Sequence, residues 1–222
     1  MRPIAGAKVH ALLTLLVLSC SSSGCAGSLF QTKVAPPTMY LLSIAPPADA
    51  AAVGGAQRAD PPFDLAVLKP RVRAGLDTDR IAALYPDRRL DYFADARWSG
   101  PLDEVIQDLV VQLFHSRAGL RNVSGDASAF ASAYWLEIEV ADFQAEYAAS
   151  GAPPTVRVHF LARIGSSGER RIIARFEADA RQPAAANRLS AIVDAYDRAA
   201  NEALMQIATS CAAALAPDSN TR

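Results

Sequence analysis

The residue with the most definite chemistry in this sequence is Cys25, because its thiol stands where a bacterial lipoprotein signal places the group that accepts a lipid. Two basic side chains come first, residues 1–24 contain no acid, and an apolar run covers residues 11–18. That run has the length of the apolar part of a secretory signal and is far shorter than the ~20 residues of a membrane span. Ser23 and Gly24 then provide small side chains before the cysteine. The pattern predicts cleavage before Cys25 and acylation of its sulfur.

Cys20 competes with Cys25 for this role. It follows the apolar run almost directly, and the bulky Leu18 lies two residues before it. Lipoprotein signals usually carry Leu three residues before the cysteine, whereas Ser22 stands at that position before Cys25. We predict Cys25 as the lipidated residue, with Cys20 as the alternative. A plain secreted protein with two incidental cysteines is the third interpretation.

Acylation at Cys25 would fix the protein to a membrane, since each buried CH₂ group contributes ~0.8 kcal/mol. Ala26 follows the cysteine, where an Asp would retain an enterobacterial lipoprotein in the inner membrane. We therefore expect a lipid-anchored protein of the cell envelope that faces the periplasm, at the outer membrane.

The sequence divides into four segments. Residues 1–24 form the signal peptide, and residues 25–62, rich in Ala and Pro, form the acylated N-terminus and a tether. Residues 63–215 form the folded domain, and residues 216–222 form a polar tail. A short apolar piece at residues 39–44 interrupts the tether and is a candidate for an edge strand.

Composition limits the function classes. Two of the 22 basic residues and none of the 23 acidic ones lie in the signal, so the mature chain carries a net charge of −3. A mildly acidic domain argues against nucleic acid as a partner. Beyond Cys25 the chain has one cysteine, Cys211, so we expect no internal disulfide and a buried thiol on a helix.

The periodicity predicts two helices. One starts at residues 99–101 and ends at Gly119, with apolar residues recurring at three and four positions. The other runs from about residue 187 to 214 with a long apolar stripe. Short strands are expected at residues 63–68, 81–84 and 90–93.

Three long strands are expected to follow residue 134. In the first, residues 135–147, the apolar phase slips by one position near Asp142, which predicts a β-bulge there. In the next two strands the inward residues are even-numbered, so opposed residues must sum to an even number. We predict a three-residue loop, Ser166 to Gly168, with Gly168 in the left-handed conformation. Phe160 would then face Ala174, and Arg157 would face Glu177.

These elements predict an α+β fold, a single domain with a mostly antiparallel sheet and two helices packed on one face. The other sheet face would be charged, and it would be either solvated or a contact surface. Its expected members are Glu137, Glu139, Arg157, His159, Arg163, Arg171 and Arg175.

The usual catalytic patterns do not occur. The sequence has no Gly-x-Ser-x-Gly elbow and no Gly-rich phosphate loop, and His115 and His159 lack metal-ligand spacing. We predict no enzymatic activity, no cofactor and no metal. Arg80 and Trp98 are the candidates for contacting a partner. The competing interpretations are a structural ion pair for Arg80 and a packing role for Trp98.

Four stretches together resemble the ABC-type transport auxiliary lipoproteins, the PqiC-like family. They are residues 39–42, 65–70, 76–81 with Asp-Thr-Asp-Arg-Ile, and 90–102 with Tyr-Phe before Trp98. The resemblance is densest over residues 63–125 and extends as a pattern to about residue 215.

The resemblance implies a lipid-anchored, non-catalytic subunit that works with an inner-membrane ABC transporter and MCE-type proteins carrying lipids between membranes. It also implies that self-association into rings is an option. Two other functions stay open: an activator or assembly factor of a cell-wall enzyme or another envelope complex, and a hydrolase with an unusual site.

Overall fold

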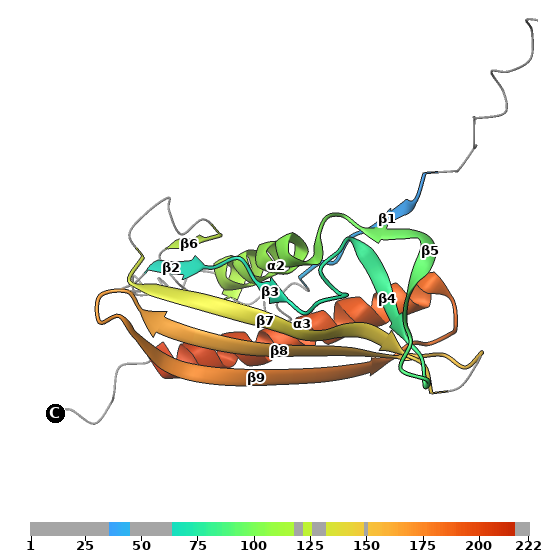
Figure 1. The fold of residues 1–222 in the computed structure, drawn as a ribbon. Coiled ribbons are helices and arrows are strands. Elements are labelled where there is room, and N and C mark those ends of the chain that lie inside the picture. Colours follow the sequence, from blue (N-terminus) through green and yellow to red (C-terminus); the bar gives the residue numbers. More distant parts are fainter. Residues whose placement is uncertain (1–35, 45–63, 118–121, 126–131, 149–150, 216–222) are drawn as a thin grey trace, which may run out of the picture. The chain divides into compact units, whose positions relative to one another are not determined.

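The computed structural model describes residues 36–44, 64–117, 122–125, 132–148 and 151–215 (Figure 1). The predicted edge strand, short strands, long strands and both helices are present within these ranges. The Gly119 stop lies outside them. The elements in chain order are β1 (Thr38–Tyr40), β2 (Asp64–Val67), β3 (Arg71–Val72), β4 (Arg80–Leu84), β5 (Leu90–Trp98), α2 (Leu102–Arg117), β6 (Asn122–Ser124), β7 (Tyr134–Glu146), β8 (Thr155–Ser166), β9 (Arg171–Pro183) and α3 (Leu189–Leu215).

The long strand β7 organises the sheet. On one side it pairs antiparallel with β8, which pairs antiparallel with β9. Its other side is shared by β2, β3 and β4, each parallel to it along a different part of its length. The chain then extends the sheet through β5 to β1 at one end and through β6 at the other.

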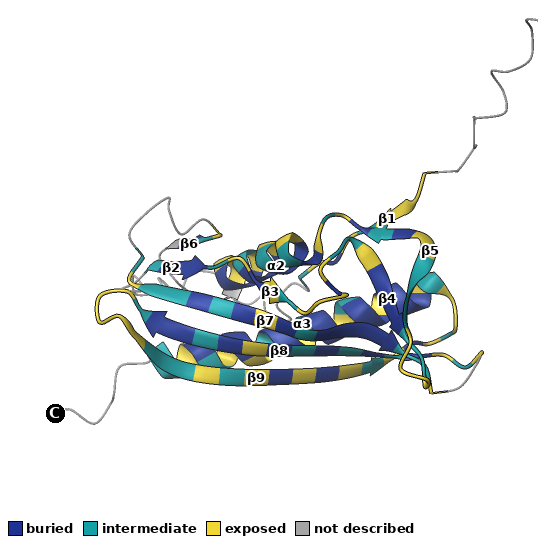
Figure 2. Ribbon diagram, in the orientation of Figure 1, coloured by how far each residue is buried: buried dark blue, intermediate teal, exposed yellow. Residues whose placement is uncertain are grey.

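Both helices contribute to a single core on one face of the sheet, which confirms the predicted α+β class. Figure 1 shows α3 running along β8 and β9. Tyr196 of α3 is fully buried, and its hydroxyl donates a 2.6 Å hydrogen bond to the Ala82 carbonyl. The apolar stripe of α2 includes Ile106 and Leu113 and is equally buried. Alternating burial along the strands is visible in Figure 2.

The bulge predicted in β7 is confirmed. The register between β7 and β8 shifts between Val140 and Asp142. Inward residues before the shift include Val140, and those after it include Phe143. The extra residue therefore lets both halves of β7 face the core while turning Asp142 to the opposite face.

The predicted β8–β9 turn is wrong in length, although the parity argument holds. Opposed residues sum to an even number from Thr155 to Ile164, as expected, but Phe160 faces Ala178 and Arg157 faces Arg181. Four residues separate the last pair, Ser166 and Arg171, and Arg170 rather than Gly168 has a positive φ. A second register shift after Ile164 absorbs the extra residue and restores the even parity.

The edge strand expected at residues 39–44 is present in part as β1, which ends at Tyr40 and pairs parallel with β5, whereas residues 41–44 follow it outside any strand. The compact unit begins at Pro37. Beyond β1, the Ser43 amide donates to Asp197 Oδ1 at 2.8 Å, and Asn201 Nδ2 donates to the Ser43 carbonyl at 2.7 Å. These bonds hold the segment against α3. No helix in the described ranges is long and apolar enough to cross a membrane.

Candidate functional site

Charged and polar side chains are most concentrated on the sheet face turned away from the helices, here called the outer ladder. It consists of charged and polar residues from four adjacent strands, with one apolar residue among them. Its members are Arg71 of β3 and Arg73 just after it, Glu137, Glu139, Asp142, Gln144 and Glu146 of β7, Arg157, His159, Leu161 and Arg163 of β8, and Arg175, Glu177, Asp179 and Arg181 of β9.

Asp142 is the centre of the outer ladder, and the bulge in β7 puts it there. Its carboxylate is buried, and two guanidinium groups and one imidazole surround it: Arg73 Nη1 at 3.3 Å, Arg157 Nη1 at 3.1 Å and His159 Nδ1 at 3.5 Å. Burial of a carboxylate is costly unless it is paired. These partners therefore allow a charged group to sit within the sheet surface.

Arg157 links Asp142 to the next strand. Its Nη2 and Nε donate to the two carboxylate oxygens of Asp179, at 2.8 and 3.2 Å, in the forked geometry that guanidinium and carboxylate groups favour. This hydrogen bonding lowers the pKa of Asp179 and raises the pKa of Arg157. His159 Nε2 lies 2.9 Å from Glu177 Oε1. The pairing therefore runs from β7 across β8 to β9.

Gln144 extends the network along β7. Only 4% of the residue is exposed. Its Oε1 accepts the Phe143 amide at 2.9 Å, and its Nε2 donates to Asp142 Oδ1 and Glu146 Oε1, each at 3.1 Å. Arg181 Nη1 lies 3.1 Å from Glu146. Every polar atom of this side-chain amide therefore has a partner, as buried amides require.

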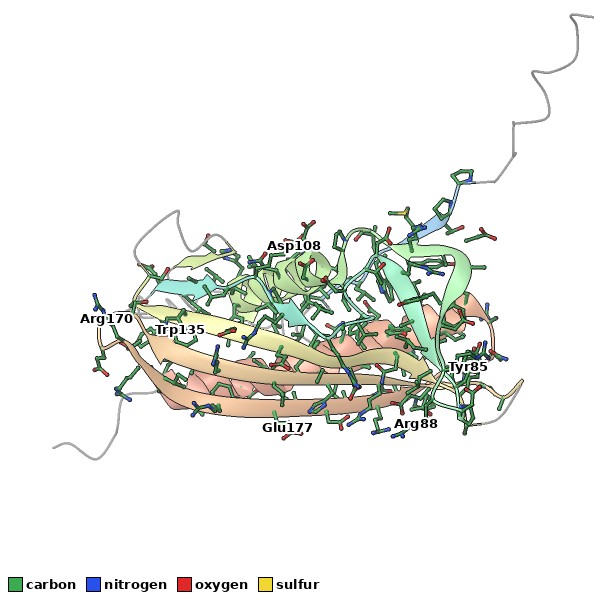
Figure 3. All side chains as sticks on the ribbon, viewed as in Figure 1. Tyr85, Arg88, Asp108, Trp135, Arg170 and Glu177 are labelled. Atoms are coloured by element: carbon green, nitrogen blue, oxygen red, sulfur yellow. The ribbon has the colours of Figure 1, made fainter. Side chains whose placement is uncertain are left out.

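A hollow of about 390 Å³ lies on the outer ladder beside a second group of ion pairs. Arg71 and Arg163 both bind Glu137 on its rim. Leu161, with 39% of its surface exposed, is an apolar side chain in this charged setting. Figure 3 shows Glu177, another lining residue, midway along β9.

Two charges at the hollow have no ion-pair partner within the described part of the chain. Glu139 of β7 is exposed beside Leu161, and Arg175 of β9 lies directly opposite Arg163. Arg163 is compensated by Glu137, whereas Arg175 is not. Like charges directly opposite each other repel, so an added anionic group near Arg175 would relieve a local imbalance.

The structure does not bring the predicted lipidation site and the predicted partner-contact residues together into one site. Cys25 and Cys20 lie outside the described residues. Trp98 is 1% exposed and packs edge-on against Phe143 and Tyr196, in agreement with the packing interpretation, and it offers no surface to a partner.

Arg80 is exposed, and its guanidinium lies 4.0 Å above the ring of Tyr92. The structural ion pair considered for it is not formed with any described residue. Asp79 instead pairs with Arg97 at 2.6 Å. A stacked arginine without a carboxylate remains available for contact with another molecule.

Two kinds of reactive group were considered within the described residues, a metal-binding cluster and a free thiol. No group of three or more His, Cys, Asp or Glu side chains gathers there in a metal-binding arrangement. Burial raises the pKa of Cys211 to about 12, so this thiol is protonated and unreactive at neutral pH. Sequence reasoning identified the charged face but missed Asp142, Gln144, Arg71 and Arg73. The predicted bulge was the available signal, because it turns Asp142 outward. Sequence reasoning also placed Arg171 on this face, whereas Arg171 lies beyond the register shift after Ile164 and is not part of the outer ladder.

Comparison with known proteins agrees with this architecture. Protein XCC0632 from Xanthomonas campestris, of family DUF330, has a similar structure with a TM-score of 0.69 and 22% identity, over 83% of this chain and 99% of that one. A second solved structure, of an uncharacterized protein, matches with a TM-score of 0.61 and 14% identity, over 80% and 99% of the two chains. At these identities the likeness concerns the fold.

No curated protein matches the sequence significantly. Residues 40–208, however, match the sequence profile described as the ABC-type transport auxiliary lipoprotein component. The matched region begins at the last residue of β1 and covers the sheet that carries the outer ladder and most of α3. The chain therefore belongs to the ABC-type transport auxiliary lipoprotein family, which associates with ABC transport components and is anchored by lipid in the cell envelope.

Proposed function

We propose that this protein is a non-catalytic docking subunit of an ABC and MCE-type lipid transport system. Acyl chains on Cys25 hold it at the outer membrane, and the outer ladder binds an MCE-type protein of the transporter. Family membership supports the general assignment. The mechanism is positional, because the domain fixes the end of a lipid conduit near its membrane.

The observation that carries this proposal is the hollow around Leu161. An exposed apolar side chain flanked by two uncompensated charges, Glu139 and Arg175, is typical of a recognition surface. The surrounding ion pairs hold the neighbouring side chains in place before a partner arrives, which lowers the entropy lost on binding. The expected partner surface presents an apolar side chain to Leu161, an anionic group to Arg175 and a cationic group to Glu139.

The proposal also includes self-association of the protein into a ring. A ring of copies would present several outer ladders to one conduit and would raise the avidity for it. Arg80, which is exposed and stacked on Tyr92, is a second candidate contact.

The test is affinity purification of the acylated protein from detergent-solubilised envelopes, followed by mass spectrometry of the proteins recovered. The wild type is expected to recover an MCE-type protein and ABC transporter subunits. The Arg175→Glu variant should reduce that recovery about tenfold, which is the effect of losing roughly 1.4 kcal/mol of binding. Mass spectrometry of the mature protein also tests the lipid on Cys25.

A matched control is available on the same hairpin. Arg170→Glu makes the same charge reversal in the β8–β9 turn, which Figure 3 shows at the end of the hairpin, away from Glu177. This variant should recover the partner as the wild type does. Equal losses in both variants would contradict docking at the hollow. Recovery of a peptidoglycan synthase, with no transporter subunit, would favour the activator function instead.

A further inference from the structure

We propose that a second surface, the tether patch, rests on the lipid bilayer and orients the domain beneath its anchor. The tether patch consists of Met39, Leu41, Arg80, Tyr92 and Arg97. The inference rests on the proposed acylation of Cys25, but it concerns a surface separate from the outer ladder and makes no use of a protein partner.

Exposed apolar surface is concentrated at the start of the folded unit. Met39 is 54% exposed and Leu41 is 76% exposed, and Leu161 of the hollow is the one other large apolar residue so exposed in the described ranges. Tyr40 and Leu42 alternate with them and pack against the core. Met39 lies on the edge strand β1 and Leu41 follows directly after it. An uncovered apolar pair at a sheet edge is unfavourable in water, so a covering surface is expected.

Basic and aromatic side chains adjoin this apolar pair on the same sheet face. Met39 is in register with Arg97, and Arg97 is in register with Arg80, so the three form a row across β1, β5 and β4. The Arg80 guanidinium covers the ring of Tyr92, whose hydroxyl donates to the Gly75 carbonyl at 2.6 Å. Asp79 neutralises Arg97, and the charge of Arg80 remains uncompensated.

Apolar side chains beside arginine and tyrosine are the composition that favours a membrane–water interface. The apolar groups enter the region below the headgroups, and the arginine binds lipid phosphates while its stem stays among apolar atoms. The ring of Tyr92 suits the same depth. The ligand class is therefore a phospholipid surface with an anionic component.

The tether patch can enter only the outermost part of the bilayer. Among the described residues β1 pairs with β5 alone, so its other edge presents backbone groups that hydrocarbon could not satisfy. We therefore expect Met39 and Leu41 to reach the boundary between headgroups and acyl chains. The bonds from Asp197 and Asn201 to Ser43 fix the segment to α3, so the orientation of the patch is transmitted to the whole domain.

The covalent chain favours a bilayer over a protein as the occupant. Twelve residue steps connect Cys25 to Pro37, where the compact unit begins. A chain of that length spans roughly 43 Å at most. An acylated Cys25 therefore keeps the tether patch permanently within reach of the lipid, at a high effective concentration, whereas a protein partner must first be encountered.

The test is a fluorescent probe attached to a single introduced thiol. Cys211 is buried with its pKa raised to about 12, and an acylated Cys25 has no free thiol, so a new surface cysteine is the reactive one. Leu41→Cys carries the probe in the tether patch, and Leu161→Cys carries it in the outer ladder as a matched control. The full acylated protein is placed in vesicles of phosphatidylethanolamine and phosphatidylglycerol, with and without brominated acyl chains.

Brominated lipid is expected to quench the Leu41→Cys probe at least threefold more than the Leu161→Cys probe, and aqueous iodide is expected to show the reverse order. Adding Arg80→Glu should reduce the lipid quenching at position 41. The proposal is overturned if iodide reaches both probes equally, or if position 41 is shielded only after a protein partner is added. A mature protein without acyl chains would overturn it as well.

Apart from the acylation of Cys25, which both assume, the two proposals fail separately. Lipid quenching at position 41 without recovery of transporter subunits would leave the tether patch in place and remove the docking function. Recovery of those subunits, with a probe at position 41 that iodide reaches freely, would support the docking function and remove the tether patch.

Discussion

The two faces of the strand β7 bury side chains of opposite chemistry, one apolar and one charged, at neighbouring positions in the sequence. Phe143 faces the helices and is enclosed by Trp98 and Tyr196. Asp142, its neighbour in sequence, faces away from them and is also buried, 9% exposed, but among arginines. The inner face is stabilised by apolar area removed from water, which tolerates no gap. The outer face is stabilised by specific pairs, so its burial depends on each partner being present.

The largest expected effect of a substitution is on the inner face. Phe143→Ala should lower the free energy of unfolding by about 3–5 kcal/mol, because the aromatic cluster loses a ring that nothing replaces. Leu161→Ala, on the outer face, should change it by less than about 1 kcal/mol because the side chain is already exposed. Urea unfolding of both variants measures the contrast. Similar losses would remove the distinction between the faces.

Removal of the buried carboxylate should have the next largest effect. Asp142→Ala leaves Arg157 and His159 without their central partner and should cost about 2 kcal/mol. The cost stays below that of a fully buried pair because Arg73 is exposed enough to regain water. A double-mutant cycle with Arg157→Ala should give a coupling energy of about 1 kcal/mol or more. Strict additivity of the two changes would contradict the pairing.

A third comparison concerns Gly165 of β8, which the ring of Trp135 on the neighbouring strand β7 covers. A Cβ at Gly165 would lie 2.2 Å from Cζ2 of Trp135, so Gly165→Ala must displace that ring and should cost about 1–3 kcal/mol. Gly168→Ala, in the adjacent turn, meets no atom within 4 Å and should be nearly neutral. The emission of Trp135 should shift in the first variant only, while Trp98 stays buried in both. An unchanged spectrum for Gly165→Ala would contradict the contact.

The smallest expected effect is the pH dependence of one outer pair. The hydrogen bond from Arg157 lowers the pKa of Asp179 below its usual 3.8. A lowered folded-state pKa contributes stability that is present above pH 3.8 and is lost as the pH falls through the folded value. The difference in unfolding free energy between the wild type and Asp179→Asn should be under about 1 kcal/mol at pH 7 and should shrink below pH 4. An equal difference at pH 3 and pH 7 would argue against the pair.

Periodicity in the sequence was sufficient for the elements that bury a continuous stripe. The two helices, the three long strands and the bulge at Asp142 follow from the apolar pattern alone, because each has enough residues to show a period. The two-residue strand β3 has no such pattern, so Arg71 in this strand and Arg73 just after it were not placed on the outer ladder.

The turn after β8 shows a second limit. Inward parity restricts opposed pairs to even sums, but it does not distinguish a three-residue loop from a four-residue loop followed by a bulge. The observed turn uses the second solution, with Arg170 at positive φ. The hollow at Leu161 could not be predicted from the sequence either. Its exposure depends on which neighbouring charges are already paired, and that depends on register.

The most direct measurement of the central claim is photo-crosslinking in living cells from an amino acid introduced at position 161, with position 170 as the control on the same hairpin. Docking through the outer ladder predicts an adduct with an MCE-type protein or an ABC transporter subunit from position 161 and none from position 170. The absence of any transporter adduct from position 161 while the acylated protein is present, or an adduct with a cell-wall synthase in its place, would contradict the assignment.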